Sequence, residues 1–170
     1  MDHEQLREFS EKQLDRVLEF SPRVDAKSSV VFGVDVGMLA LLATNAPSVH
    51  ALDWYMLFAL VPLFLIGSSL WHLYQGSFPI LEGGYQSLIY FREIAQRTED
   101  QFVEEFLSTD NDAFMKDLLA QVWRNSEILK QKYDHLKSAF STLALATPFW
   151  VISLAMFAAR NTESKTLLMK

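Results

Sequence analysis

The side chains that could carry out chemistry are few in this chain and widely scattered. The four histidines, His3, His50, His72 and His135, lie in different segments, and no two form a metal-ligand pair at helical spacing. Asp35, Ser69 and His72 include the residue types of a nucleophilic triad, but the sequence has neither a nucleophile elbow nor an oxyanion hole. We therefore predict no catalytic residue, no metal site and no enzyme.

The composition excludes several kinds of binding partner and site. The chain has 170 residues, is 50% hydrophobic, carries a net charge of −6 and contains no cysteine. This length suits one domain with a sizeable core, and the negative charge argues against nucleic acid as a partner. The missing cysteines exclude disulfides and thiolate metal sites, and the N-terminus lacks the apolar core of a secretory signal.

Three long, nearly uncharged runs must position the remaining residues: 28–46, 51–74 and 141–159. A bilayer core of about 30 Å takes roughly 20 helical residues. The helices of a soluble bundle normally carry a polar stripe, and these runs carry none. The sequence predicts an all-α integral membrane protein with three transmembrane helices and a cytoplasmic helical region, 75–140, continuous with the last span.

Lysine and arginine predict the orientation. They gather before the first run and between the second and third runs, and none lies in the short loop 47–50. By the positive-inside rule, segments 1–27 and 75–140 face the cytoplasm of a multi-pass protein. The C-terminal tail, 160–170, then lies outside, although it carries Arg160, Lys165 and Lys170.

The segments outside the runs are expected to be mainly helical. An N-terminal helix should end before Ser21-Pro22, and either packs on the cytoplasmic bundle or lies on the bilayer surface. A turn is expected over 76–84, and helix again over 87–97. Thr98 and Gln101 form a capping-box pattern that predicts a helix through Leu107.

A further helix should begin near Asn111 or Asp112. Apolar residues at three- and four-residue spacing continue from there into the third run, so one rod of about 70 Å is expected from Asp112 to Ala158. Pro148 should kink it within the bilayer. The rod either carries movement from the soluble region into the membrane or is a static anchor.

Asp35 lies within GVDVG, the only charge of the first run. At about 100° per residue, Gly33 and Gly37 share one face, which favours close approach of another helix, and Asp35 points nearly opposite. Counting along the antiparallel second run places Ser68, Ser69 and His72 at a similar depth. Two interpretations stay open: a hydrogen bond that holds helices together, or a carboxylate lining a water-filled path through an oligomer.

Three segments carry a family resemblance: DAKSSVVFGVD (25–35), SLIYFREIAQRTEDQFVEEF (87–106) and DLLAQVWRNSEILKQKYDHLKSAF (117–140). Together they resemble the Pycsar transmembrane effector family over almost the whole chain apart from its termini. The resemblance implies a bacterial inner-membrane antiphage effector. A partner uridylate or cytidylate cyclase makes cyclic UMP or cyclic CMP during infection, and the effector responds by impairing the membrane, so that the infected cell dies before phage is released.

A cyclic mononucleotide needs a cation for its phosphate, an aromatic or aliphatic face for its base and a polar group for specificity. There is no glycine-rich phosphate cradle and no β-roll pattern, so any site should be helical. We expect a homo-oligomer, with the site either within one subunit or shared between subunits. No other cofactor is expected, and the alternative is a membrane scaffold that binds no messenger. The candidate ligand residues are Tyr90, Arg92, Arg97, Trp123, Arg124, Asn125, Lys130 and Tyr133.

Overall fold

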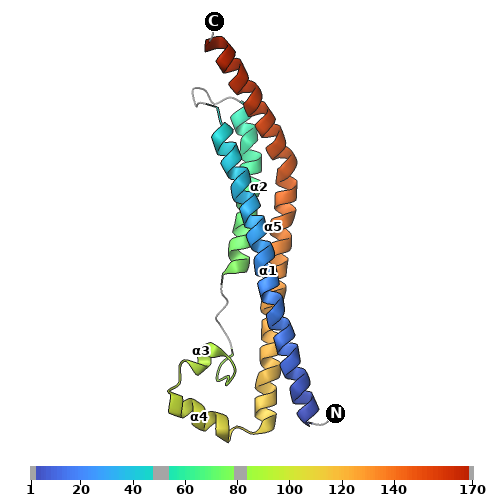
Figure 1. Ribbon diagram of the computed structural model, residues 1–170, viewed down its shortest axis with the longest axis vertical. Coiled ribbons are helices and arrows are strands. Elements are labelled where there is room, and N and C mark those ends of the chain that lie inside the picture. The colour runs from blue at the N-terminus through green and yellow to red at the C-terminus, as the bar shows by residue number, and fades with distance from the viewer. Residues whose placement is uncertain (1–2, 48–53, 79–83, 169–170) are drawn as a thin grey trace. The chain divides into compact units, whose positions relative to one another are not determined.

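The computed structural model describes residues 3–47, 54–78 and 84–168, and the side chains of 4–47, 54–78 and 84–162. Most of the predicted loop at 47–50 and most of the predicted turn at 76–84 lie outside these residues, as does His50. All the regular structure in the described residues is helical (Figure 1). The helices are α1 (His3–Asn45), α2 (Trp54–Ser77), α3 (Phe91–Ile94), α4 (Glu99–Ser108) and α5 (Asn111–Leu168). The all-α prediction is confirmed.

The chain divides into two compact units. The first unit comprises Met1–Asp25 and Phe78–Tyr133, and the second comprises Ala26–Ser77 and Asp134–Lys170. The helices α1 and α5 each contribute residues to both units. The predicted continuity of the helix that begins near Asn111 with the third apolar run is therefore confirmed, and the helix also extends through the predicted tail to Leu168.

The predicted end of the first helix before Ser21-Pro22 is wrong, because α1 continues through Pro22 to Asn45. A proline inside a helix removes one backbone hydrogen bond, but Pro22 is exposed, so water can reach the carbonyl that loses its partner. Within the first unit, Lys132 of α5 also binds α1 on both sides of the proline. Its Nζ donates to Ser21 over 3.1 Å and to Asp25 over 2.8 Å.

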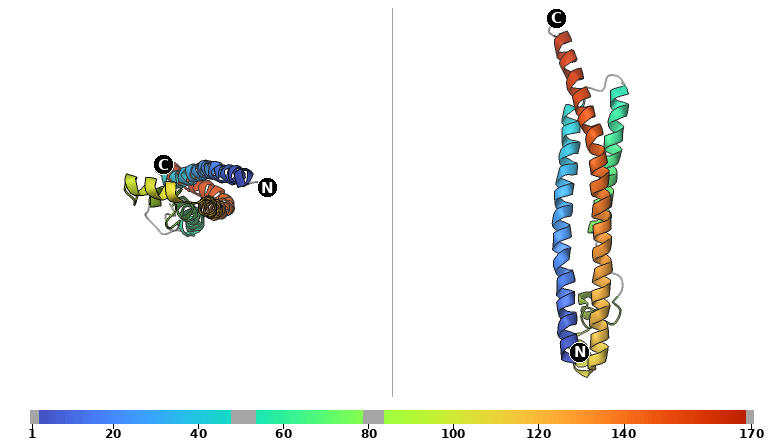
Figure 2. Two further views of the ribbon diagram at one scale, coloured as in Figure 1. Left: turned by 90° about the horizontal axis from the view of Figure 1, so that it is seen from below. Right: turned by 90° about the vertical axis from the view of Figure 1, so that its right-hand side faces the viewer.

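The second unit is a three-helix bundle of α1, α2 and α5 (Figure 2). Its core includes residues from all three helices, among them Val31 of α1, Ile66 of α2 and Ala146 of α5. Two side chains of α5 bind backbone carbonyls of α1: Trp150 Nε1 donates to Met38 over 2.9 Å, and Asn161 Nδ2 donates to Asn45 over 3.1 Å. The second of these bonds satisfies a carbonyl that the end of α1 leaves without a helical partner.

Three helices, α1, α2 and α5, are long and apolar enough to cross a membrane. Many of their large apolar side chains point away from the bundle core, as lipid contact requires and as a soluble bundle would avoid. Those at least half exposed include Val30, Phe32, Leu57, Leu60, Phe64, Trp71, Leu145 and Val151.

Local side-chain caps begin α4 and α5. Thr98 accepts the N–H of Gln101, whose side chain accepts the N–H of Thr98, so the predicted capping box is confirmed. Asp110 accepts the N–H of Ala113 over 2.7 Å at the start of α5. The predicted helix over 87–97 is wrong, since only the single turn α3 forms there.

Candidate functional site

The loop before α3 is held by side chains of α5 in place of helical hydrogen bonds. Oδ2 of Asp117 accepts the Ser87 hydroxyl over 3.0 Å and the Leu88 N–H over 2.8 Å. The Ser87 oxygen in turn accepts the N–H groups of Ile89 and Tyr90 over 3.1 and 3.0 Å. These bonds hold the loop in a non-helical conformation, in which Tyr90 is extended (φ −78°, ψ 117°). The Ser87 carbonyl, which would accept the Phe91 N–H in a helix over 87–97, instead accepts from Arg97.

Gly84, Tyr90 and Arg124 form a tight cluster beside this loop. Gly84 has a φ of +72°, and a Cβ there would lie 2.6 Å from Nη1 of Arg124 and 2.9 Å from Cδ1 of Tyr90. The Arg124 guanidinium lies over the Tyr90 ring, 4.2 Å from its centroid. The structure thus brings together two of the predicted ligand residues, as a cation–π pair.

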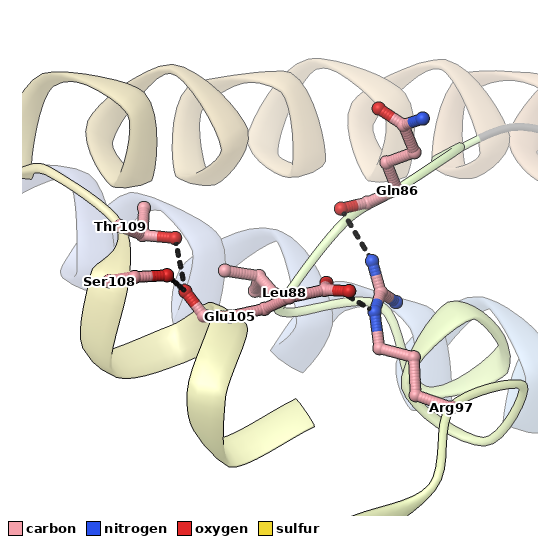
Figure 3. Close-up of a pocket in the computed structure, with 6 residues that line it drawn as sticks. All are labelled: Gln86, Leu88, Arg97, Glu105, Ser108 and Thr109. Carbon is pink, nitrogen blue, oxygen red and sulfur yellow. Dashed lines mark hydrogen bonds and ion pairs between the residues drawn. The ribbon is translucent and has the colours of Figure 1, made fainter. Parts of the chain in front are cut away.

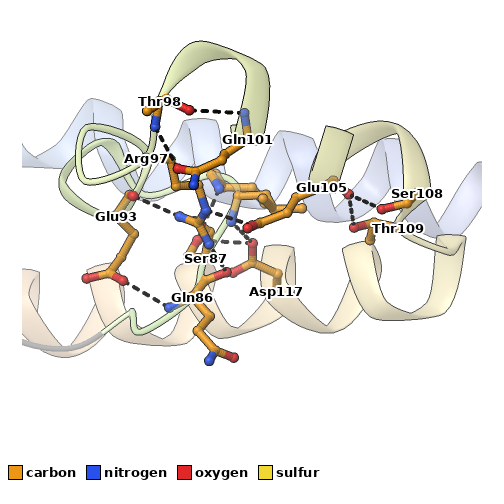
Figure 4. Close-up of polar contacts among 12 residues, drawn as sticks. Gln86, Ser87, Glu93, Arg97, Thr98, Gln101, Glu105, Ser108, Thr109 and Asp117 are labelled. Carbon is orange, nitrogen blue, oxygen red and sulfur yellow. Dashed lines mark hydrogen bonds and ion pairs between the residues drawn. The ribbon is translucent and has the colours of Figure 1, made fainter. Parts of the chain in front are cut away.

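Arg97 binds three backbone carbonyls and one carboxylate (Figure 4). Its Nε lies 2.7 Å from Glu105, its Nη1 donates to the carbonyls of Ser87 and Glu93, and its Nη2 donates to that of Gln86. A guanidinium has five N–H donors, and these bonds use four of them. One Nη2 hydrogen has no acceptor among the described residues.

A pocket of about 400 Å³ opens beside Arg97 (Figure 3). The Arg97 side chain is 13% exposed and that of Glu105 is 52% exposed. The pocket combines one cation, one carboxylate, an apolar side chain and polar groups. Its lining residues are Gln86, Leu88, Arg97, Glu105, Ser108 and Thr109.

The other predicted ligand residues lie elsewhere in the first unit. Trp123 is 69% exposed on α5. The Asn125 amide donates to the carbonyl of Gln121 one turn earlier, so one of its two N–H donors binds its own helix. Arg92 and Lys130 are exposed and Tyr133 is half-buried, and none of these three lines the Arg97 pocket.

The sequence patterns do not predict several residues that line the pocket or support it. Glu105 and Gln86 line the pocket, Asp117 and Ser87 fix the loop, and Gln121 Nε2 donates to Ser87 over 3.1 Å. One signal is present in the sequence: Asp117 and Gln121 are four residues apart and so share a face of α5.

Elsewhere in this unit, the hydrogen bond from Lys12 lowers the pKa of the exposed Glu8 carboxyl.

Asp35 is fully buried in the second unit and lies against α2. The Ser69 hydroxyl oxygen lies 2.7 Å from Oδ2 of Asp35. Ser68 and His72 are half-buried on the same helix, and the His72 ring lies 6.1 Å from that of His135. No group of three metal-ligand side chains occurs among the described residues.

Gly33 and Gly37 lie on the exposed side of α1, opposite Asp35, as their spacing predicts. An added Cβ at either glycine would meet nothing within 4 Å. The close helix approach expected at these glycines therefore does not occur within one chain, in the part that the structure describes.

The comparison with protein families gives a match over residues 9–159 to the Pycsar effector protein domain. No curated protein and no solved structure matches the chain. The family match covers most of the chain, with most of both units, all of α2 and most of the other two candidate spans. The chain therefore belongs to the Pycsar effector protein domain family, a family of antiphage defence effectors.

Proposed function

We propose that this effector binds cyclic UMP or cyclic CMP, made by a partner cyclase, and then impairs the bacterial inner membrane so that the infected cell dies. Family membership supports the role in defence. The Arg97 guanidinium, with one N–H left at the wall of a pocket, is the observation that carries the ligand proposal.

The pocket offers one group for each part of a cyclic mononucleotide. Arg97 supplies the charge and the N–H for the single phosphate charge. Glu105 supplies an acceptor for the ribose 2′-hydroxyl, and Leu88 supplies an apolar surface for the base. The Gln86 amide points away from Arg97 in Figure 3, and rotation of this exposed side chain would bring to the pocket a group that can both donate to and accept from a pyrimidine edge. A volume of about 400 Å³ lies at the small end of the roughly 300–1,000 Å³ common for ligand sites, which suits a one-ring base.

The Arg124 and Tyr90 pair is assigned a supporting role. Because the guanidinium already covers one face of the Tyr90 ring, a base cannot stack there. The pair instead fixes the loop that carries Gln86 and Leu88 into the pocket wall. Arg92, Trp123, Asn125, Lys130 and Tyr133 stay predictions for contacts with the nucleotide in an oligomer.

The membrane step is assigned to the second unit. The exposed apolar side chains of α1, α2 and α5 suit a bilayer, and positive charges in 1–27 and 75–140 favour a cytoplasmic first unit, where a cyclase releases its product. Since α5 is helical from Asn111 to Leu168, binding in the first unit has an unbroken helical path to the second.

We further propose that copies of the chain assemble through the Gly33 and Gly37 face. Glycine inside a helix costs roughly 1 kcal/mol relative to alanine, and no described residue of the same chain lies within 4 Å of a Cβ added at either glycine. Small residues four apart allow helices to approach closely in membranes. Gly33→Leu with Gly37→Leu should therefore lower the oligomeric mass measured in detergent, whereas Gly67→Leu on α2 should not.

Calorimetry on the purified chain in detergent tests the ligand. We expect saturable heat with cyclic UMP or cyclic CMP and none with cyclic AMP. A 2′-deoxy analogue of the active nucleotide should bind at least tenfold more weakly, since a hydrogen bond to a charged group contributes about 1.5–3 kcal/mol. The absence of heat with every cyclic nucleotide would favour the scaffold alternative.

Glu105→Gln tests the pose within the pocket. Glutamine can still accept from Arg97, but it removes the charge that binds the 2′-hydroxyl, so the preference for ribose over deoxyribose should shrink. Glu104→Gln, at an exposed neighbour on α4, is the matched control and should keep the full preference. If Glu105→Gln keeps the full preference for ribose, Glu105 does not bind the 2′-hydroxyl.

A further inference from the structure

Three helices of the second unit meet at a buried polar contact. The Ser69 hydroxyl oxygen on α2 lies 2.7 Å from Oδ2 of Asp35 on α1 and 3.1 Å from the carbonyl oxygen of Ala139 on α5. All three residues are 0% exposed. Oδ1 of Asp35 has no hydrogen-bond partner among the described residues.

The number of hydrogens decides the direction of these bonds. A serine hydroxyl has one hydrogen, and a backbone carbonyl can only accept. If the Ser69 hydrogen goes to Ala139, the hydrogen between Ser69 and Asp35 has to come from Asp35. If Asp35 is ionised, one of the two short contacts joins two oxygen atoms with no hydrogen between them.

Asp35 has no cationic partner among the described residues, and α1 has no other charged residue between Lys27 and its end. The titratable groups one turn from the contact are His72, after Ser69 on α2, and His135, before Ala139 on α5. Their rings contact each other. A buried carboxylate with one neutral donor is far more costly than a neutral acid with one free carbonyl oxygen.

We infer that Asp35 is a proton-binding site, and that in the closed bundle its carboxyl group is a neutral acid that donates to Ser69. The Ser69 hydroxyl then donates to the carbonyl of Ala139. Two hydrogen bonds in series, Asp35 to Ser69 to Ala139, join α1, α2 and α5 without leaving a charge in the core. Of the two interpretations that the sequence leaves open for Asp35, this arrangement corresponds to the hydrogen bond that holds helices together, and it makes that bond depend on a proton.

Infrared spectroscopy of the purified protein in lipid at neutral pH measures this proton directly. We expect a carbonyl stretching band from a protonated carboxyl that moves when aspartate is labelled with carbon-13. The band should be lost in Asp35→Asn and kept in Asp25→Asn, which removes an exposed, ion-paired aspartate. In Ser69→Ala the band should persist but shift, because the acid loses its acceptor.

Wild-type protein without such a band, or a band that survives Asp35→Asn, would overturn the inference. If Asp35→Asn does not fold, the Ser69→Ala shift and the carbon-13 shift in wild-type protein still decide the matter. A labelled band unmoved by Ser69→Ala would then assign the proton to another aspartate. None of these measurements needs the nucleotide, so failure here and failure of the proposed function are distinguishable.

Discussion

Oδ2 of Asp117 accepts the backbone N–H of Leu88 over 2.8 Å, although 29 positions separate the two residues in the chain. The same oxygen accepts the Ser87 hydroxyl, so one carboxylate of α5 fixes the start of the loop that leads to α3. Because Gln86 and Leu88 line the Arg97 pocket, Asp117 shapes the pocket without lining it.

Asp117→Asn should loosen this loop. An asparagine oxygen is a weaker acceptor than a carboxylate, and leaving a part-buried donor poorly satisfied costs about 1–3 kcal/mol. We expect faster amide hydrogen exchange at Leu88, Ile89 and Tyr90. Asp134→Asn, at an exposed aspartate of α5, is the control and should leave these rates unchanged. Equal exchange in the two variants would show that Asp117 does not hold the loop.

How well each element could be predicted depends on how far away its stabilising partner lies. The starts of α4 and α5 were predictable because Thr98 and Gln101 are three residues apart, and Asp110 caps its own helix. The helix over 87–97 was wrongly predicted because a group that holds the non-helical loop, Asp117, lies far along the chain. Helical spacing alone placed Asp35 opposite the glycines, but no sequence pattern marks the carbonyl of Ala139 as a partner.

Gly84→Ala should destabilise the first unit. A φ of +72° is unfavourable for alanine by about 1–2 kcal/mol, and the added Cβ would press on Tyr90 and Arg124. Thermal unfolding in detergent should therefore occur at a lower temperature. Gly67→Ala is the matched control, since Gly67 is helical and has open space around it. It should raise stability by up to about 1 kcal/mol. If Gly84→Ala leaves the unfolding temperature unchanged, the loop adopts another conformation in solution.

A flexible break in α5 should separate binding from membrane damage. Replacing Lys137 and Ser138 with glycines costs roughly 1 kcal/mol each in helix propensity. Calorimetry should still detect nucleotide binding by this variant, while the dye leakage that the nucleotide triggers should fall. The corresponding double alanine variant, which keeps the helix, should leak like wild type. If the glycine variant leaks fully, α5 serves as an anchor and carries no signal.

Dye release from lipid vesicles that contain the purified chain tests the central claim most directly. The nucleotide is present on both sides of the bilayer, so that either orientation of the protein can respond. We predict that cyclic UMP or cyclic CMP triggers release, that cyclic AMP does not, and that the nucleotide has no effect on vesicles without protein. Vesicles that hold correctly folded protein and stay sealed with both pyrimidine nucleotides would contradict the account.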